Sequence, residues 1–199
     1  PSKVAGLTVI SRELANDSTP AAAETVGRGL ARDIAKKIDT AYFANTTPNG
    51  PNGLGSLTTS VVDTGAAITN TDPFAEALSK AEHQGAVITA FLGNPADVLA
   101  LAKIKKQSGS NEPLLGADPT QPTQRTILGV PLIPTPAATA GVIWGIPSQF
   151  VEVVVREDFT LDVDKSAFFT SDRVAVRATL RVGFGFPHPM SIVKLFDAP

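Results

Sequence analysis

The side chains that could perform acid–base or nucleophilic chemistry are few and scattered along the chain. His83 and His188 are the only histidines, and cysteine is absent. Thiolate nucleophiles, thiolate metal sites and disulfides are therefore excluded. A serine–histidine–aspartate arrangement would need residues from distant segments, and no Gly-x-Ser-x-Gly turn presents a serine for it. We interpret each histidine as a surface or hydrogen-bonded structural residue, and we expect no enzymatic activity.

Motifs for phosphates, dinucleotides and metal ions are also missing. The segment Gly183–Phe186 alternates glycine with phenylalanine, which indicates a strand or bulge and not a phosphate-binding loop. No Walker loop or strand-linked dinucleotide fingerprint occurs. Two histidines without cysteine do not make a zinc site, and no spaced carboxylate loop indicates calcium or magnesium. The sequence therefore predicts no cofactor and no metal.

Regularly spaced charges do occur in the last third of the chain. Arg173, Arg177 and Arg181 lie in one alternating segment, and Asp162 and Asp164 lie in the segment before it. Two interpretations stay open. The arginines form cross-strand ion pairs with the aspartates, at about 0.2–1 kcal/mol each, or they pair with acidic groups of another subunit and orient it. Aromatic residues for base stacking are not interleaved there, which disfavours nucleic-acid binding.

Composition supports a protein whose surface is partly covered by other subunits. The 199 residues fit one large domain or two small interleaved ones. Only 18% are charged, below the usual quarter, whereas the hydrophobic share of 43% is ordinary. The net charge of −2 does not indicate a nucleic-acid binder. No apolar run is long enough to cross a bilayer. Because the chain begins at Pro1, we expect a processed or trimmed product.

Apolar periodicity predicts an α+β fold that begins with a strand and a long helix. A strand over 4–14 precedes a helix start at Asn16–Pro20, where a polar cap meets a proline. The helix is expected over 20–43, because apolar residues recur every four positions from Val26 to Tyr42. Turn-forming residues then predict a loop over 45–60.

The remainder alternates strands with two short helices. Helices are expected from Asp72 to Gly85 and from Asn94, which caps ahead of Pro95. A mobile loop is expected over 108–123. Strict alternation predicts a hairpin-like pair of strands with one buried face. The expected buried strands are 86–92, 127–133 (edge or bulged, because of Pro131), 142–146 and 150–155, and the alternating pair is 159–164 with 173–182.

Several segments together resemble the major capsid (coat) proteins of tailed bacteriophages. Residues 156–194 resemble the C-terminal segment of the family. There an acidic strand is followed by an aromatic residue, then by an alternating strand with Arg-Ala-x-x-Arg, and finally by a strand bounded by prolines. Asn94–Asp97 resembles the start of its central helix. Leu128–Leu132 resembles its Leu-Gly-x-Pro-hydrophobic strand, and Ser11–Leu14 resembles the entry into its long helix. The motifs follow the family's order along nearly the whole chain.

The resemblance implies the Hong Kong phage-type coat fold. In that fold a peripheral domain holds a long spine helix and the terminal strands, and an axial domain lies at the centre of each capsomer. Here the peripheral domain is expected over 1–45 and 156–199, and the axial domain over 46–155. The family carries an arm and an extended loop before the spine helix, most of which this chain lacks, so we expect a shortened form.

The resemblance also implies a structural function. Copies would assemble into hexamers and pentamers of an icosahedral shell that encloses double-stranded DNA without sequence-specific binding. Scaffold, portal and decoration proteins are further expected partners, a membrane is not, and the expected location is the virion, after assembly in the host bacterial cytoplasm. Charge reversal at Arg177 or Arg181 is expected to lower particle yield. The alternatives are an encapsulin-like compartment shell and a soluble α+β enzyme or ligand-binding domain.

Overall fold

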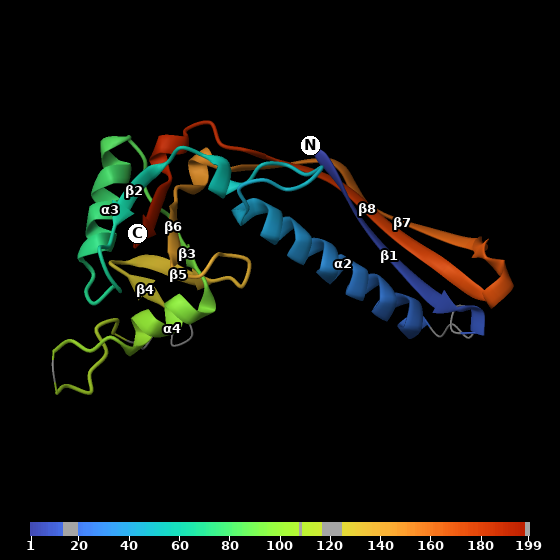
Figure 1. Ribbon diagram of the computed structural model, residues 1–199, viewed down its shortest axis with the longest axis horizontal. Helices are drawn as coiled ribbons and strands as arrows, with labels where there is room; N and C mark the ends of the chain where they lie inside the picture. The colour runs from blue at the N-terminus through green and yellow to red at the C-terminus, as the bar shows by residue number, and fades with distance from the viewer. Residues whose placement is uncertain (14–19, 108, 117–124, 198–199) are drawn as a thin grey trace. The chain divides into compact units, whose positions relative to one another are not determined.

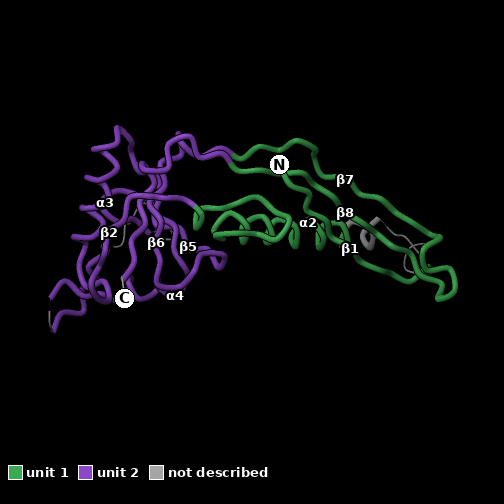
Figure 2. Tube along the Cα trace, turned by 45° about the horizontal axis from the view of Figure 1, so that its top comes forward, with its two compact units in different colours: residues 1–56, 153–184 green, residues 57–152, 185–199 purple. Residues whose placement is uncertain are grey.

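The computed structural model describes residues 1–13, 20–107, 109–116 and 125–197. The chain folds into two compact units (Figure 2), both of which combine helix and strand. Unit 1 comprises Pro1–Ser56 and Val153–Phe184, and unit 2 comprises Leu57–Glu152 and Gly185–Pro199. The chain thus crosses from one unit to the other three times. The predicted helix start at Asn16–Thr19 lies outside the described residues.

Unit 1 is a three-stranded sheet with one long helix beside it (Figure 1). The strand order is β1-β8-β7, so β8 is central and β7 forms an edge. Its elements are β1 (Ser2–Ser11), α2 (Pro20–Phe43), η1 (Leu54–Ser56), β7 (Glu152–Phe168), η3 (Phe169–Ser171) and β8 (Arg173–Gly185). The helix predicted over 20–43 is confirmed at both ends.

The core of unit 1 forms where one face of α2 meets the sheet. Leu30 and Ile34 are buried and pack against Val176 and Ala178 of β8. On β1, Gly6 lies so close to the helix that a Cβ built there would stand 3.3 Å from Cδ2 of Leu30. The four-residue apolar spacing therefore does what the sequence indicated: it turns one stripe of the helix toward the sheet.

Unit 2 is built around a six-stranded mixed sheet in the order β2-β9-β6-β3-β5-β4. Pairing is parallel for β2 with β9 and for β3 with β5, and antiparallel elsewhere. Its elements are β2 (Ser60–Asp63), α3 (Asp72–His83), β3 (Ala90–Gly93), α4 (Pro95–Lys103), β4 (Thr126–Ile127), β5 (Val130–Pro134), β6 (Val142–Ile146), η2 (Ser148–Phe150), η4 (Pro189–Ser191) and β9 (Val193–Phe196).

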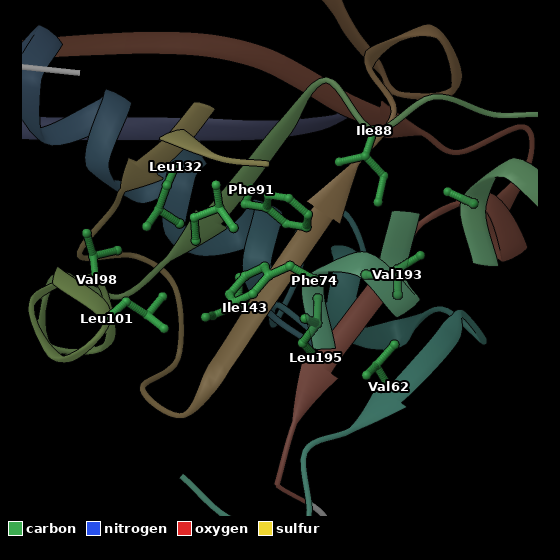
Figure 3. Packing of buried hydrophobic residues seen from close by; sticks show 13 residues of the cluster. Val62, Phe74, Ile88, Phe91, Val98, Leu101, Leu132, Ile143, Val193 and Leu195 are labelled. Carbon is green, nitrogen blue, oxygen red and sulfur yellow. The ribbon is translucent and has the colours of Figure 1, made fainter. Parts of the chain in front are cut away.

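The core of unit 2 joins α3 and α4 to this sheet (Figure 3). Phe74 of α3 and Phe91 of β3 are fully buried, and their rings meet edge to face with centroids 5.1 Å apart. Val98 and Leu101 add the buried side of α4. The capping prediction for α4 is confirmed, because the Asn94 side chain accepts the backbone N–H of Ala96 at 3.0 Å.

Two strand predictions are wrong in their boundaries. Residues 127–133 are not one strand but a hairpin, because Leu128 and Gly129 take φ values of 52° and 81° and form a two-residue turn between β4 and β5. Pro131 lies on β5, which is second from the edge. In the segment 86–92 only the end forms a ladder, since β3 begins at Ala90.

The predicted domain boundaries also differ from the observed units. The loop over 45–60 divides between the units at Ser56 and Leu57, and the second crossing lies at 152–153, close to the expected 155. Residues 185–199 were expected with the long helix, but they belong to unit 2. The reason is strand pairing: β9 inserts between β2 and β6 and supplies the buried residues Val193 and Leu195 to that core.

Candidate assembly interface

The regularly spaced charges lie on β7 and β8 of unit 1. Arg177 Nη2 donates to Asp162 Oδ2 at 2.9 Å, across the two strands. Beside this pair the hydroxyls of Thr160 and Thr179 lie 2.7 Å apart. Direct cross-strand partners share one face of a sheet. These contacts therefore place Thr160 and Asp162 of β7 on the same polar face of the sheet as Thr179 and Arg177 of β8.

The remaining predicted charges have separate positions. Arg181 pairs through Nε with Glu157 Oε2 at 3.0 Å, so its partner is neither of the predicted aspartates. Asp164 accepts the hydroxyl and the backbone N–H of Ser166, both at 2.7 Å, and these hydrogen bonds lower the pKa of the Asp164 carboxyl. Arg173 is exposed at the start of β8. The sequence missed Glu157, although it stands in the same acidic strand.

A further ion pair ties the end of β1 to the β7–β8 turn. Arg12 Nε lies 3.0 Å from Asp172 Oδ1, and the Arg12 backbone N–H donates to the Asp172 carbonyl at 3.0 Å. Asp172 adopts φ 50°, which aspartate tolerates better than most residues. Phe169 in this turn is 75% exposed.

The whole of β7 is exposed, contrary to the sequence prediction. All 17 of its residues are exposed, and they include Val153, Val154 and Val155 of the segment 150–155 that was expected to be a buried strand. Alternation also predicted one buried face for the 159–164 segment, but Phe159, Leu161 and Val163 are 39%, 46% and 56% exposed. On β8 the prediction is right, since Val174, Val176, Ala178 and Val182 are buried.

Each of the two histidines has a contact within the described residues. His83 Nδ1 lies 2.8 Å from the Ser79 carbonyl oxygen on its own helix, and His188 stacks on Phe150 with ring centroids 5.3 Å apart. Within the described ranges, no group of three or more His, Asp or Glu side chains could hold a metal ion. No helix of the described part is both long and apolar enough to span a membrane.

Unit 2 contains a cavity of about 300 Å³ between α4, β6 and β9. Its lining is largely apolar, and its charged members are Asp97 and Asp197. Asp97 is already engaged, because its Oδ2 accepts the backbone N–H of Gly141 at 2.8 Å. Enzyme and ligand sites converge several polar groups on one pocket. This cavity lacks that convergence.

Comparison with known proteins distinguishes a capsid protein from an enzyme or ligand-binding domain. A model of the phage capsid family matches residues 1–196. The chain belongs to the phage capsid family. It is therefore a structural component of a virion shell and not an enzyme, as the sequence predicted. A search of curated proteins finds no significant match.

Solved structures show the same capsid fold along the whole chain. The capsid of the native GTA particle superimposes with a TM-score of 0.75 and 19% identity, over 100% of this capsid protein and 73% of that chain. Mycobacterium phage Adephagia gives 0.74 and 17%, over 99% and 72%. A virus-like particle from Pyrococcus furiosus gives 0.65 and 19%, over 98% and 77%. The predicted Hong Kong phage-type coat fold is thereby confirmed.

Proposed function

We propose that this capsid protein is the major shell subunit of a tailed bacteriophage, and that its copies form hexamers and pentamers of an icosahedral shell around double-stranded DNA. The match of the family model to residues 1–196 carries the proposal. Strand β7 supports it, because it is exposed along its whole length, and a long edge strand with apolar side chains is a surface that other chains cover.

In this proposal unit 1 is the peripheral domain and unit 2 is the axial domain. Unit 1 contains the long helix α2 and the β1-β8-β7 sheet, which provide rigid elements for contacts with neighbours. Many such contacts act together in a closed shell, so each can be weak. Weak contacts allow subunits to detach and rebind while a shell forms.

The DNA is enclosed without sequence-specific binding. The net charge of −2 supports this, because proteins that bind DNA strongly neutralise phosphates with clustered lysine and arginine. Scaffold, portal and decoration proteins are proposed as additional partners, and the host bacterial cytoplasm as the place of assembly.

A compartment shell is the second candidate, because the virus-like particle from Pyrococcus furiosus shares this fold. The two functions differ in what the particle contains. Electron microscopy of particles formed by the full-length protein in bacteria, followed by nuclease treatment and extraction of the contents, separates them. Icosahedral particles that enclose nuclease-protected DNA, when they are isolated from bacteria infected with the phage that encodes the protein, support the phage capsid. Particles that contain only protein cargo favour the compartment, and a protein that forms no particles refutes both.

A further inference from the structure

The outer side of helix α2 presents a row of basic side chains. Arg28, Arg32 and Lys36, which we call the α2 basic stripe, follow one another at four-residue intervals and are all exposed. Residues four apart lie on the same side of a helix. Each of the three lies two positions from Leu30 or Ile34, which the helix buries against the sheet, and two positions correspond to about 200° around the helix axis. The stripe therefore lies on the side of α2 that faces away from the sheet of unit 1.

The charges of the stripe are not neutralised by their own helix. The four positions that adjoin Arg32 along the helix hold arginine, glycine, alanine and lysine, so its charged neighbours have the same sign. Asp33 and Asp39 lie three positions from Lys36, yet in the described part of the chain neither carboxylate forms an ion pair with it. Arg28 interacts with another group of the chain. Arg32 and Lys36 are therefore the charges of the stripe that remain available to a partner.

Several other closely spaced cations differ, because they are engaged within the chain. On the polar face of the sheet, Arg177 and Arg181 each pair with a carboxylate. In the segment after α4, Lys106 pairs with a glutamate. These cations already have anionic partners. Arg32 and Lys36 do not have one among the described residues, so their natural partner is an anion outside the chain.

We propose that the α2 basic stripe contacts the phosphate backbone of the packaged DNA, and that this side of unit 1 faces the interior of the shell. The inference rests on the proposed shell function. From Arg28 to Lys36 the helix rises about 12 Å. Duplex DNA has about seven phosphate charges over that length of its axis. A duplex that lies against α2 therefore offers phosphates to each member of the stripe.

The surroundings of the stripe favour DNA over an acidic protein. The neighbouring residues on this side of the helix are small or polar, and no large apolar side chain of α2 is exposed among the described residues. Protein partners need an apolar core in the interface, whereas phosphate contacts depend on charge alone and do not read the sequence. A few such contacts per subunit also agree with the net charge of −2 and with DNA that is enclosed without sequence-specific binding.

The salt dependence of DNA binding by the purified full-length subunit tests the charge contacts. Arg32→Gln and Lys36→Gln each remove one charge from the stripe. Lys37→Gln is the matched control, because Lys37 is also exposed on α2 but lies about 100° around the helix from Lys36. Fluorescence anisotropy of a labelled duplex of mixed sequence gives the affinity between about 10 and 100 mM salt, where phosphate contacts dominate.

Each phosphate contact adds about −0.9 to the slope of log K against log salt concentration. We expect Arg32→Gln and Lys36→Gln each to make the slope shallower by about 0.9, and the double variant by about 1.8. Lys37→Gln should change the slope by less than half as much as either. Arg32→Lys keeps the charge and should keep the slope, and circular dichroism of every variant checks that α2 is folded.

The orientation of α2 is tested in DNA-filled particles isolated from infected bacteria. Formaldehyde should link Lys36 to nucleotides, which mass spectrometry of the peptides detects after nuclease digestion. Lys3 is the control. It is exposed, and it lies on the opposite face of the sheet because its neighbour Val4 packs against the helix. We expect no nucleotide on Lys3.

Each contrary result has a separate meaning. The inference is overturned if the stripe variants leave the slope unchanged, if Lys37→Gln changes it equally, or if nucleotides attach to Lys3 and not to Lys36. If polyglutamate binds as tightly as the duplex and the same variants weaken it, the stripe is a site for acidic protein and the inference is wrong. DNA-filled particles without a link at Lys36 leave the shell function intact. Particles that enclose no DNA end the proposed function, whatever the dispersed subunit binds.

Discussion

Exchanging the charges of Arg177 and Asp162 distinguishes an ion pair within the chain from one between subunits. Both interpretations follow from the sequence, and the structure shows the two side chains 2.9 Å apart across β7 and β8. Arg177→Glu places two acidic groups at this position. The double variant Arg177→Glu with Asp162→Arg restores opposite charges in reversed order.

The expected effect on folding is small. The two side chains are 55% and 58% exposed, and exposed pairs of this kind contribute about 0.2–1 kcal/mol. Like charges placed opposite each other cost a similar amount. Arg177→Glu should therefore lower the free energy of unfolding by about 0.5–2 kcal/mol, well below the roughly 5–15 kcal/mol that keeps a domain folded. The loss of stability should be smaller at 1 M salt, where the Debye length is only about 3 Å and exposed charges are strongly screened from one another.

The effect on assembly should be larger than the effect on folding. Repulsion between β7 and β8 displaces the edge strand, and β7 is exposed along its whole length, where we propose that other chains cover it. We expect Arg177→Glu to lower the yield of closed particles, measured by electron microscopy and sedimentation, while the subunit remains folded by circular dichroism. The charge-exchanged double variant should recover both stability and yield.

Two results would refute this reasoning. If the double variant recovers stability but not particle yield, Arg177 acts on another subunit and not on Asp162. If it recovers neither, the cross-strand pair does not contribute as its geometry indicates. Thr160→Ser, on the same polar face, is the matched control and should change neither stability nor yield.

Three further predictions concern the stability of the subunit. Burial raises the pKa of Tyr42, the only tyrosine, from 10.0 to about 12. The contribution of the neutral, buried side chain to the free energy of unfolding is therefore complete below about pH 10 and is lost as the pH rises through about 12. Tyrosinate absorbance should show the shifted midpoint, and Tyr42→Phe should remove this part of the loss of stability at alkaline pH. Phe74→Ala should cost about 3–5 kcal/mol, because it empties a fully buried site against Phe91, and denaturant unfolding followed by fluorescence of Trp144, the only tryptophan, measures it. A Cβ at Gly53 would overlap backbone carbonyls at the end of α2, so Gly53→Ala should lower the melting temperature of the subunit, whereas Gly27→Ala, with open space around it, should leave it unchanged or raise it.

Local signals in the sequence were sufficient for the helices. The four-residue apolar spacing and Pro20 predicted α2 with its observed bounds, and Asn94 with Pro95 predicted the start of α4. These features depend on residues within a few positions of one another. Helix caps and apolar stripes are therefore visible in a single sequence.

The pairing of strands that lie far apart in the sequence was harder to predict. The sequence placed the last fifteen residues with the long helix, but β9 lies between β2 and β6, more than 40 residues away along the chain. A short apolar strand carries no information about which neighbours it will pair with. The hairpin turn at Leu128 and Gly129 was missed for a different reason. Leucine rarely adopts a positive φ, so the pair Leu128–Gly129 does not resemble the usual Asn-Gly turn.

The misprediction of β7 has a physical cause that bears on function. Alternation along a strand records which face avoids water in the functional state, and in an assembly that state includes neighbouring copies. β8 meets the prediction within one chain because α2 supplies the cover, whereas Phe159, Leu161 and Val163 of β7 have the same pattern without a cover. Burial that is predicted from the sequence but missing in one subunit is therefore evidence for a contact surface. This evidence is more specific than exposure alone, because the alternation identifies which face of the strand is in contact.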